Sequence, residues 1–202
     1  MKATKIVLIG DSGVGKTSLI YSYQKGISPR YQGYADWDKS IGASYKPGKI
    51  LKQNEVIQHI VLAYDTPGGE NWQKMRTEIV YPNIMPDIFL VCFSVDSYSS
   101  YENIKNVYVP EIRQHCPEIP FLIVGTKMDL FDQEKKEEDW RVSTDEARYH
   151  TAIELGAYKY MECTAKGLCL IELQNVITQA EHTAEYEKWK RTRTECPKNF
   201  FF

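Results

Sequence analysis

The chain has 202 residues, a formal net charge of −2 at pH 7 and 43% hydrophobic residues. This length suits one domain with a sizeable core, and we expect a domain over residues 1–185 and a tail over residues 186–202. The near-neutral charge balance excludes the basic footprint of a nucleic-acid-binding protein. The five cysteines are odd in number and form no Cys-x-x-Cys pair, which is typical of reduced thiols. No stretch resembles a signal peptide or a membrane span, so the sequence predicts a cytoplasmic protein.

The segment at residues 10–17 reads GDSGVGKT and directly follows an apolar run at residues 4–9. A glycine-rich loop between a strand and a helix cradles a phosphate, because backbone N–H groups converge on it and the helix adds its positive end. Lys16 is predicted to reach the β- and γ-phosphates, and the Thr17 hydroxyl to bind Mg²⁺. Because residues 17–24 have a helical pattern, the context fits and the sequence predicts a nucleotide-binding loop.

Beyond the first helix, loops, strands and helices alternate. Residues 26–42 have no regular period and are expected to form a long, functional loop. The charge-dense residues 131–140 are interpreted as a solvated surface segment. Strands are predicted over residues 44–51, 56–64, 87–95, 120–125 and 158–163, the first two as a hairpin. Helices are predicted over residues 70–80, 97–116, 143–155 and 170–190, with Tyr81-Pro82 stopping the first, Pro110 kinking or breaking the second, and Ser97 or Ser99 capping it.

This order of elements predicts a doubly wound α/β domain with a mostly parallel, six-stranded sheet and one antiparallel hairpin. Polar motifs follow three of the predicted strands, at residues 65–70 (DTPGGE), 126–129 (TKMD) and 164–166 (TAK). Because such sheets bind ligands at the carboxyl ends of their strands, we expect these motifs to lie beside the phosphate loop.

Taken in order and spacing, residues 10–17, 65–68, 126–129 and 163–166 resemble those of the Ras superfamily of small GTPases, and the likeness covers about residues 4–185. Thr126, where most small GTPases have asparagine, is similar to Rac proteins, and residues 131–140 occupy the place of the Rho insert. Further segments that look like the Rho/Rac branch are Tyr81-Pro82, residues 92–97, residues 102–104, residues 110–112, residues 155–157 and residues 160–163.

The resemblance implies a small G domain of the P-loop NTPase class that binds GTP or GDP with Mg²⁺ and hydrolyses GTP. It implies effector proteins that bind switch segments at about residues 26–44 and 65–80, an exchange factor, a GTPase-activating protein and a role in control of the cytoskeleton. A P-loop ATPase or kinase is the rival class. Asp129 argues against that rival, because its carboxylate can accept two hydrogen bonds from guanine that adenine cannot donate.

The resemblance also assigns roles to individual residues. Asp65 would hold Mg²⁺ through water, and the Gly68 N–H would meet the γ-phosphate. The predicted nucleotide-binding set is Ser12, Gly13, Val14, Gly15, Lys16, Thr17, Ser18, Tyr31, Ser40, Gly68, Thr126, Lys127, Asp129, Thr164, Ala165 and Lys166. The predicted metal set is Thr17, Ser40 and Asp65, and the predicted catalytic set is Lys16, Gly68 and Gly69.

The chain departs from the family pattern at several positions. Gly69 stands where the family has the glutamine that orients the attacking water, so hydrolysis is predicted to be slow. The alternative is a GTP-locked, effector-binding pseudo-GTPase without significant turnover. Ser40 is the best match to the threonine of the first switch, and Tyr31 is the candidate for bracing the guanine.

The tail also departs from the Rho pattern. A C-a-a-X box is missing because Asn199 is the fourth residue from the end, so prenylation is not predicted. Basic residues around Trp189, together with the terminal phenylalanines, allow peripheral contact with the inner face of a membrane, with a disordered soluble tail as the alternative.

Overall fold

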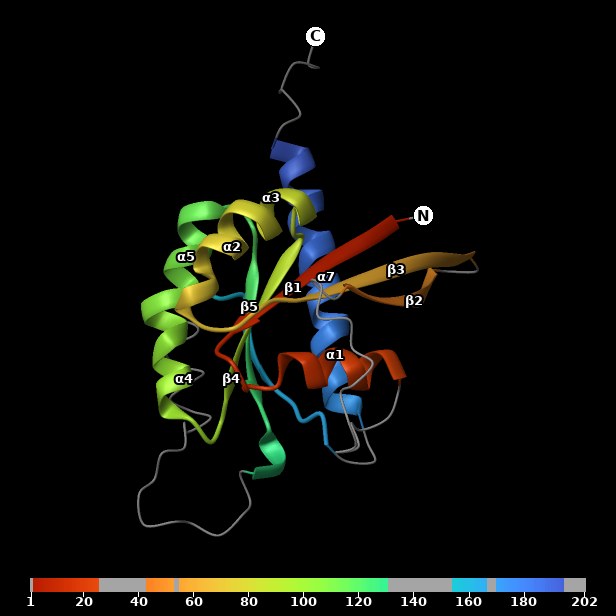
Figure 1. Cartoon of the computed structure of the whole chain (residues 1–202). Coiled ribbons are helices and arrows are strands. Elements are labelled where there is room, and N and C mark those ends of the chain that lie inside the picture. The colour runs from red at the N-terminus through yellow and green to blue at the C-terminus, as the bar shows by residue number, and fades with distance from the viewer. Residues whose placement is uncertain (1, 26–42, 53–54, 131–153, 167–169, 195–202) are drawn as a thin grey trace.

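The structure is a computed structural model, and it describes residues 2–25, 43–52, 55–130, 154–166 and 170–194 (Figure 1). Its centre is a six-stranded sheet in the order β2-β3-β1-β4-β5-β6. Strand β2 pairs antiparallel with β3, and all other neighbours pair in parallel, which confirms the predicted fold class and its hairpin. The strands are β1 (Lys2–Gly10), β2 (Ala43–Lys52), β3 (Glu55–Asp65), β4 (Ile88–Ser94), β5 (Phe121–Thr126) and β6 (Lys159–Glu162).

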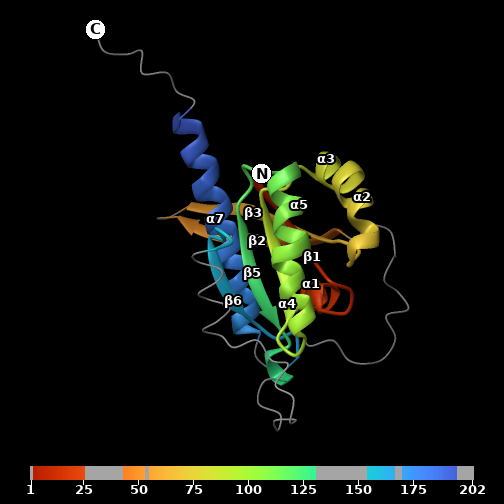
Figure 2. The ribbon, with the colours of Figure 1, turned by 90° about the vertical axis from the view of Figure 1, so that its left-hand side faces the viewer.

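Helices cover both faces of the sheet (Figures 1 and 2). One face carries α1 (Lys16–Lys25) and α7 (Ile171–Thr194). The other face carries two longer helical runs, and a short 3₁₀ turn, η5 (Met128–Leu130), follows β5. The first run consists of η2 (Glu70–Trp72), α2 (Gln73–Met75), η3 (Arg76–Val80) and α3 (Tyr81–Ile84). The second consists of α4 (Tyr98–Asn103), η4 (Ile104–Tyr108) and α5 (Val109–His115).

The core divides into two layers because successive side chains of a strand point to opposite faces. In β1, Ile6 and Leu8 pack in the layer beneath α1 and α7, whereas Val7 and Ile9 pack beneath α4 and α5. Every residue of β4 and β5 is buried, so their continuous apolar runs reflect strands covered on both faces. The predicted apolar face of the last helix is confirmed, since its members are all buried: Leu170, Leu173, Ile177, Ala180 and Ala184.

One prediction about the prolines was wrong, and another was wrong in one of its two alternatives. The first helical run does not stop at Tyr81-Pro82 but continues to Ile84, and it ends where Met85 adopts a φ of 52°. Pro110 does not break the second run, which continues through it after a π-helical segment. Each proline is the second residue after a π-helical segment, Pro82 after η3 and Pro110 after η4, where the regular i→i−4 bonding pattern of the α-helix is already interrupted. The predicted cap at Ser97 is confirmed, since its hydroxyl accepts a hydrogen bond from the Ser100 N–H at 3.3 Å.

Several predicted segments lie outside the described residues: the loop at 26–42 with Tyr31 and Ser40, the charged residues 131–140, most of the helix at 143–155, and residues 195–202. Helix α7 runs across the predicted domain boundary at residue 185 and ends at Thr194, and that boundary remains a prediction. In the described part of the chain, no helix combines the length and the hydropathy needed to cross a bilayer.

Candidate functional site

The phosphate loop connects the end of β1 to the start of α1. Lys16 is only 6% exposed, and its ammonium donates to the carbonyl oxygens of Gly10 at 2.8 Å and Asp11 at 2.7 Å. Burial lowers the pKa of Lys16 from its ordinary value, while the nearby Asp65 carboxylate favours its charged form. Among the described residues these two carbonyls take two of the three ammonium N–H groups, which leaves one for an anionic ligand.

The predicted metal residues Thr17 and Asp65 are in direct contact. Asp65 ends β3 beside Leu8 of β1, and its Oδ2 accepts a hydrogen bond from the Thr17 hydroxyl. Its Oδ1 is buried and has no hydrogen-bond partner among the described residues. Burial raises the pKa of Asp65 in spite of the Thr17 hydrogen bond and the Lys16 charge. This orphaned oxygen and the neighbouring hydroxyl are hard oxygen donors, so they fit Mg²⁺.

No group of three His, Cys, Asp or Glu side chains that could hold a metal occurs within the described residues. A cation at Asp65 would therefore take most of its ligands from groups other than the carboxylates, imidazoles and thiols of the described residues. This fits Mg²⁺, which usually keeps several waters and binds through one or two carboxylates together with phosphate oxygens.

The loop after β3 lies directly against the phosphate loop. Thr66 anchors it by donating to the Leu8 carbonyl at 2.7 Å. A Cβ atom at Gly68 would lie 2.4 Å from the Ser12 nitrogen and 2.7 Å from the Asp11 carbonyl oxygen, so only glycine fits there. The structure thus brings the predicted γ-phosphate contact, Gly68, to the phosphate loop.

Gly69 has a φ of 94° and a ψ of 160°, a conformation that is essentially restricted to glycine. Its N–H donates to the Tyr108 hydroxyl at 3.0 Å, and its carbonyl accepts from the Arg76 guanidinium at 2.9 Å. Position 69 therefore contributes no side chain to the site, and both of its backbone polar groups are bonded to other parts of the protein.

Arg76 and Glu111 form a buried pair behind this loop, with exposed fractions of 0% and 1%. The guanidinium donates from Nε and Nη2 to the two carboxylate oxygens, at 2.8 Å and 2.6 Å. The Tyr81 hydroxyl donates to the same carboxylate. Two-pronged contact of this kind is the strongest geometry available to an Arg–carboxylate pair.

Sequence reasoning missed this pair, although a signal was present. Val80 and Ile84 are buried and lie four and eight residues after Arg76, so helical periodicity places Arg76 on the same inner face. Glu111 likewise lies among the buried residues of its helical run, next to Ile112. A buried arginine and a buried glutamate on two apolar faces predict a mutual ion pair, because neither charge can be buried alone.

The third and fourth motifs lie at the ends of β5 and β6. The Thr126 hydroxyl lies within hydrogen-bond distance of the carbonyl oxygens of Val14 and Phe93, which share its one proton, and so ties the phosphate loop to β5. Lys127 has a φ of 60°, and its ammonium lies 3.8 Å from Asp96 Oδ1. Ser22 of α1 donates to the Ala165 carbonyl at 3.2 Å, which links the first helix to the last motif.

Asp129 is held by the motif that follows β6. The Thr164 hydroxyl donates to its Oδ1 at 2.6 Å, and the Lys166 ammonium lies 3.5 Å from its Oδ2. The Lys166 N–H also donates to the Thr164 hydroxyl at 3.0 Å. Two motifs that lie 35 residues apart thus meet at one carboxylate.

The structure brings most of the predicted site residues to one edge of the sheet. Val14 is 2% exposed and its side chain packs in the core, so only its backbone can face a ligand. Ser12 and Gly13 are exposed in the loop, and Ser18 lies in α1. Tyr31 and Ser40 lie outside the described residues.

A phosphate loop at the carboxyl end of β1, with Asp65 beside Thr17 and two further loops on the same edge, defines a P-loop nucleotide-binding domain. The model of the Ras family matches residues 5–185 of the chain. The chain therefore belongs to the Ras family of small GTPases, which are nucleotide-binding switches with GTPase activity.

Proposed function

We propose that this chain is a Rho/Rac-like guanine-nucleotide switch that binds GTP and GDP with Mg²⁺ and hydrolyses GTP slowly. The observation that carries the proposal is the buried, unpartnered Oδ1 of Asp65 beside the Thr17 hydroxyl and the buried Lys16 ammonium. A divalent cation would neutralise the carboxylate, and phosphate oxygens would accept from the ammonium. The site is thus complementary to a metal-bound polyphosphate.

Each described residue has a definite task in this proposal. Lys16 binds the phosphates and stabilises charge on the transferring group, and the Gly68 N–H senses the terminal phosphate. Thr17 and Asp65 would hold Mg²⁺, which neutralises phosphate charge when it is bound. Asp129, fixed by Thr164, accepts from the guanine ring. Lys127, Ala165 and Lys166 complete the base pocket.

Hydrolysis is slow in this proposal because no side chain at position 69 orients the attacking water. The glycine-only conformation of Gly69 adds to this argument, since the loop is built around a residue without a side chain. The same observation favours the second candidate, a GTP-locked module that binds effectors without turnover.

The Rho/Rac assignment rests on the resemblance of several sequence segments, and two of these segments are in contact. The hydroxyl of Tyr81, from the first segment, donates to Glu111 of the second. Effector proteins, an exchange factor and a GTPase-activating protein are the partners that this assignment implies. In the same proposal the protein acts in the cytoplasm, and the tail at residues 186–202 supplies peripheral contact with the inner face of a membrane.

The decisive experiment identifies the nucleotide that co-purifies with the protein and follows its single-turnover hydrolysis. Bound GDP with measurable turnover supports a slow switch, and bound GTP with negligible turnover supports the locked module. Displacement of the bound guanine nucleotide by ATP would refute both. Removal of Mg²⁺ by EDTA should weaken nucleotide binding by roughly tenfold or more, since the phosphates lose a neutralising charge.

A matched pair of variants tests the base pocket. Asp129→Ala should weaken GDP binding by roughly two orders of magnitude, because guanine donors would be left unpaired. The control is Glu118→Ala, which removes an exposed carboxylate from the opposite end of the sheet. Equal GDP affinity for the two variants would contradict the assigned role of Asp129.

A further inference from the structure

The hydroxyl of Tyr108 lies between the phosphate loop and the loop after β3. It donates to Asp11 Oδ1 at 2.7 Å and accepts from the Gly69 N–H at 3.0 Å. Asn103, five residues earlier in the same helical run, donates to the other Asp11 oxygen at 2.8 Å. A single hydroxyl therefore connects two loops that the sequence separates by more than fifty residues.

This hydroxyl keeps its proton under all ordinary conditions. Tyr108 is fully buried, and burial, together with the hydrogen bond to Asp11, raises its pKa. Because its proton is directed at the Asp11 carboxylate, its lone pair is directed at the Gly69 N–H. The orientation of both bonds is thus fixed by the chemistry of the two partners.

The other side of the loop is held by Arg76. Its Nη1 donates to the carbonyl of Pro67 at 3.0 Å and to that of Gly69 at 2.9 Å. Arg76 is itself fixed by the two-pronged bond to Glu111 and lies over the Tyr108 ring, 5.3 Å from its centroid. The short segment around Gly68 is therefore held from both sides, by Arg76 of the first helical run and by Tyr108 of the second.

Each of these bonds joins two protein groups, so none of them needs a nucleotide atom as its partner. In small GTPases generally, contacts with the γ-phosphate order the second switch, and hydrolysis releases it. Here the protein itself supplies contacts that hold Gly68 over the phosphate loop.

We propose that Tyr108 is a positioning residue that keeps the Gly68–Gly69 turn in its phosphate-contacting place in the GDP state as well as in the GTP state. The part of the second switch around this turn therefore changes its conformation little when the γ-phosphate is lost. The comparison of GDP and GTP states rests on the proposed function. The contact of the Tyr108 hydroxyl with Asp11 and Gly69 does not rest on it. Holding the turn in advance also lowers the ordering cost of binding GTP.

The test is hydrogen exchange of residues 66–76 in the wild type and in Tyr108→Phe, in nucleotide-free, GDP-bound and GTP-analogue-bound protein. We expect wild-type exchange in the GDP and GTP-analogue states to agree within about twofold. Tyr108→Phe should speed exchange at Gly69 by about tenfold in the nucleotide-free and GDP states, because it removes the acceptor of that N–H.

Nucleotide affinities give a second readout that a purely structural role would not move. Tyr108→Phe should weaken binding of the GTP analogue by roughly threefold to tenfold and binding of GDP by less than about twofold, since only the former uses the turn. The matched control is Tyr98→Phe, which removes an exposed hydroxyl from the start of the same helical run. It should change neither readout.

Equal exchange in the wild type and Tyr108→Phe would overturn the proposal. The proposal would also be overturned if residues 66–76 of the GDP-bound wild type exchanged as fast as those of GDP-bound Tyr108→Phe. If the chain bound no guanine nucleotide, the proposed function would fail, and exchange in the nucleotide-free protein would still decide the role of Tyr108. If Tyr108→Phe did not fold, Asp11→Ala would serve, because it removes the acceptor that orients the hydroxyl.

Discussion

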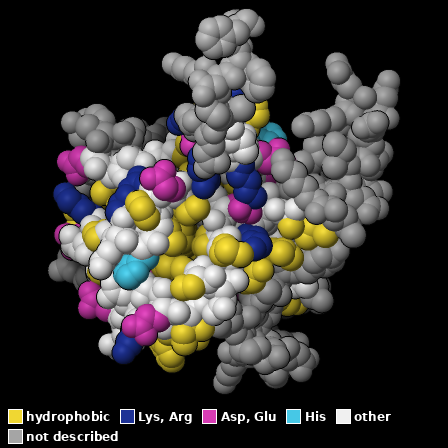
Figure 3. All heavy atoms as spheres, turned by 90° about the horizontal axis from the view of Figure 1, so that it is seen from above, with side chains coloured by type: hydrophobic (Ala, Val, Ile, Leu, Met, Phe, Trp, Pro, Cys, Tyr) yellow, Lys and Arg dark blue, Asp and Glu magenta, His cyan; other side chains and the backbone are white. Residues whose placement is uncertain are grey.

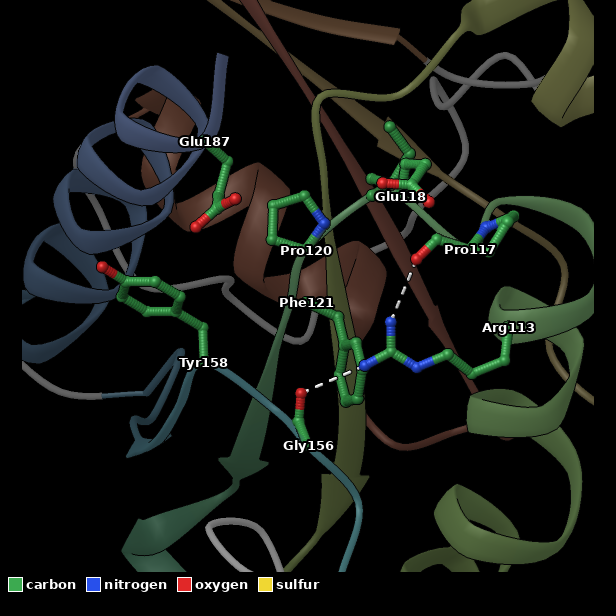
Figure 4. Close-up of a pocket in the computed structure, with 9 residues that line it drawn as sticks. Arg113, Pro117, Glu118, Pro120, Phe121, Gly156, Tyr158 and Glu187 are labelled. Atoms are coloured by element: carbon green, nitrogen blue, oxygen red, sulfur yellow. Dashed lines mark hydrogen bonds between the residues drawn. The ribbon is translucent and has the colours of Figure 1, made fainter. Parts of the chain in front are cut away.

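Two arginines hold loops at opposite ends of the sheet, and they do so in different ways. At the candidate site, Arg76 donates to the carbonyls of Pro67 and Gly69 and is fully buried against Glu111. At the far end, Arg113 donates to the carbonyls of Pro117 and Gly156 at 3.2 Å and 3.1 Å (Figure 4). Arg113 is exposed, and in the described part of the chain no carboxylate forms an ion pair with it.

The surroundings of the two side chains explain the difference. The Arg113 guanidinium lies 4.9 Å from the centroid of the Phe121 ring and lines a shallow hollow beside Tyr158 and Glu187 (Figure 4). Seen from this end, the molecule mixes hydrophobic side chains with charged ones of both signs (Figure 3). Water can solvate a charge there, whereas the charge of Arg76 depends on Glu111.

Burial against a carboxylate distinguishes the way Arg76 holds its loop from the way Arg113 does. Both arginines bond two carbonyls, but only Arg76 would leave a buried, unpaired charge if its partner were removed. The loop at the candidate site is therefore the more strongly fixed of the two, which suits a segment that must present Gly68 at a set place.

The largest expected effect is that of Arg76→Ala. It leaves the buried Glu111 carboxylate without its cation and frees two loop carbonyls, so we expect the free energy of unfolding to fall by about 3–5 kcal/mol. Urea denaturation followed by circular dichroism measures this. A loss no larger than that of Arg113→Ala would remove the contrast between the two ends.

Gly69→Gln should have the next largest effect. Its φ and ψ are essentially restricted to glycine, so glutamine must shift the loop and weaken the bonds to Tyr108 and Arg76. We expect a loss of about 2 kcal/mol in the free energy of unfolding. The control is Lys74→Gln, which introduces the same side chain at an exposed position of the helical run that follows Gly69. Equal stability of the two variants would show that position 69 tolerates a side chain.

Asp65→Asn should stabilise the protein when it is free of nucleotide and metal, by about 1 kcal/mol at pH 7. Burial raises the folded-state pKa of Asp65 above its unfolded value, so the ionised carboxylate costs stability as the pH rises through that interval. The gain from asparagine should accordingly shrink as the pH is lowered. Thermal unfolding across this pH range measures the gain in stability. If Asp65→Asn were less stable than the wild type at pH 7, the unpartnered Oδ1 would not be what destabilises the folded wild-type protein.

The smallest expected effect is that of Arg113→Ala, about 0.5 kcal/mol. The substitution removes two solvent-exposed hydrogen bonds and a contact with the Phe121 ring, and no buried charge remains behind. Differential scanning calorimetry at two salt concentrations should show little change between them. A loss comparable to that of Arg76→Ala would mean that the far end is held as firmly as the site.

Local patterns were enough to predict the six strands, the helices of the described residues and their order. Apolar runs predicted β1, β4 and β5, and the polar motifs at residues 65–70, 126–129 and 164–166 predicted loops at one edge of the sheet. The predicted stop at Tyr81-Pro82 and the predicted break at Pro110 were errors, because a proline indicates the end of a helix unless the hydrogen-bond pattern before it is known. The segments at 26–42 and 131–140 remain predictions.

The sequence by itself determined the phosphate loop, the α/β class and the family, because glycine spacing, lysine and threonine identity and hydrophobic periodicity are local properties. Only the tertiary structure decided which groups hold the candidate site together. Arg76 meets Glu111 across 35 residues and Tyr108 meets Asp11 across 97. Helical periodicity can place Arg76 and Glu111 on inner helix faces, but which faces pack together, and at what register, is decided only by the tertiary structure.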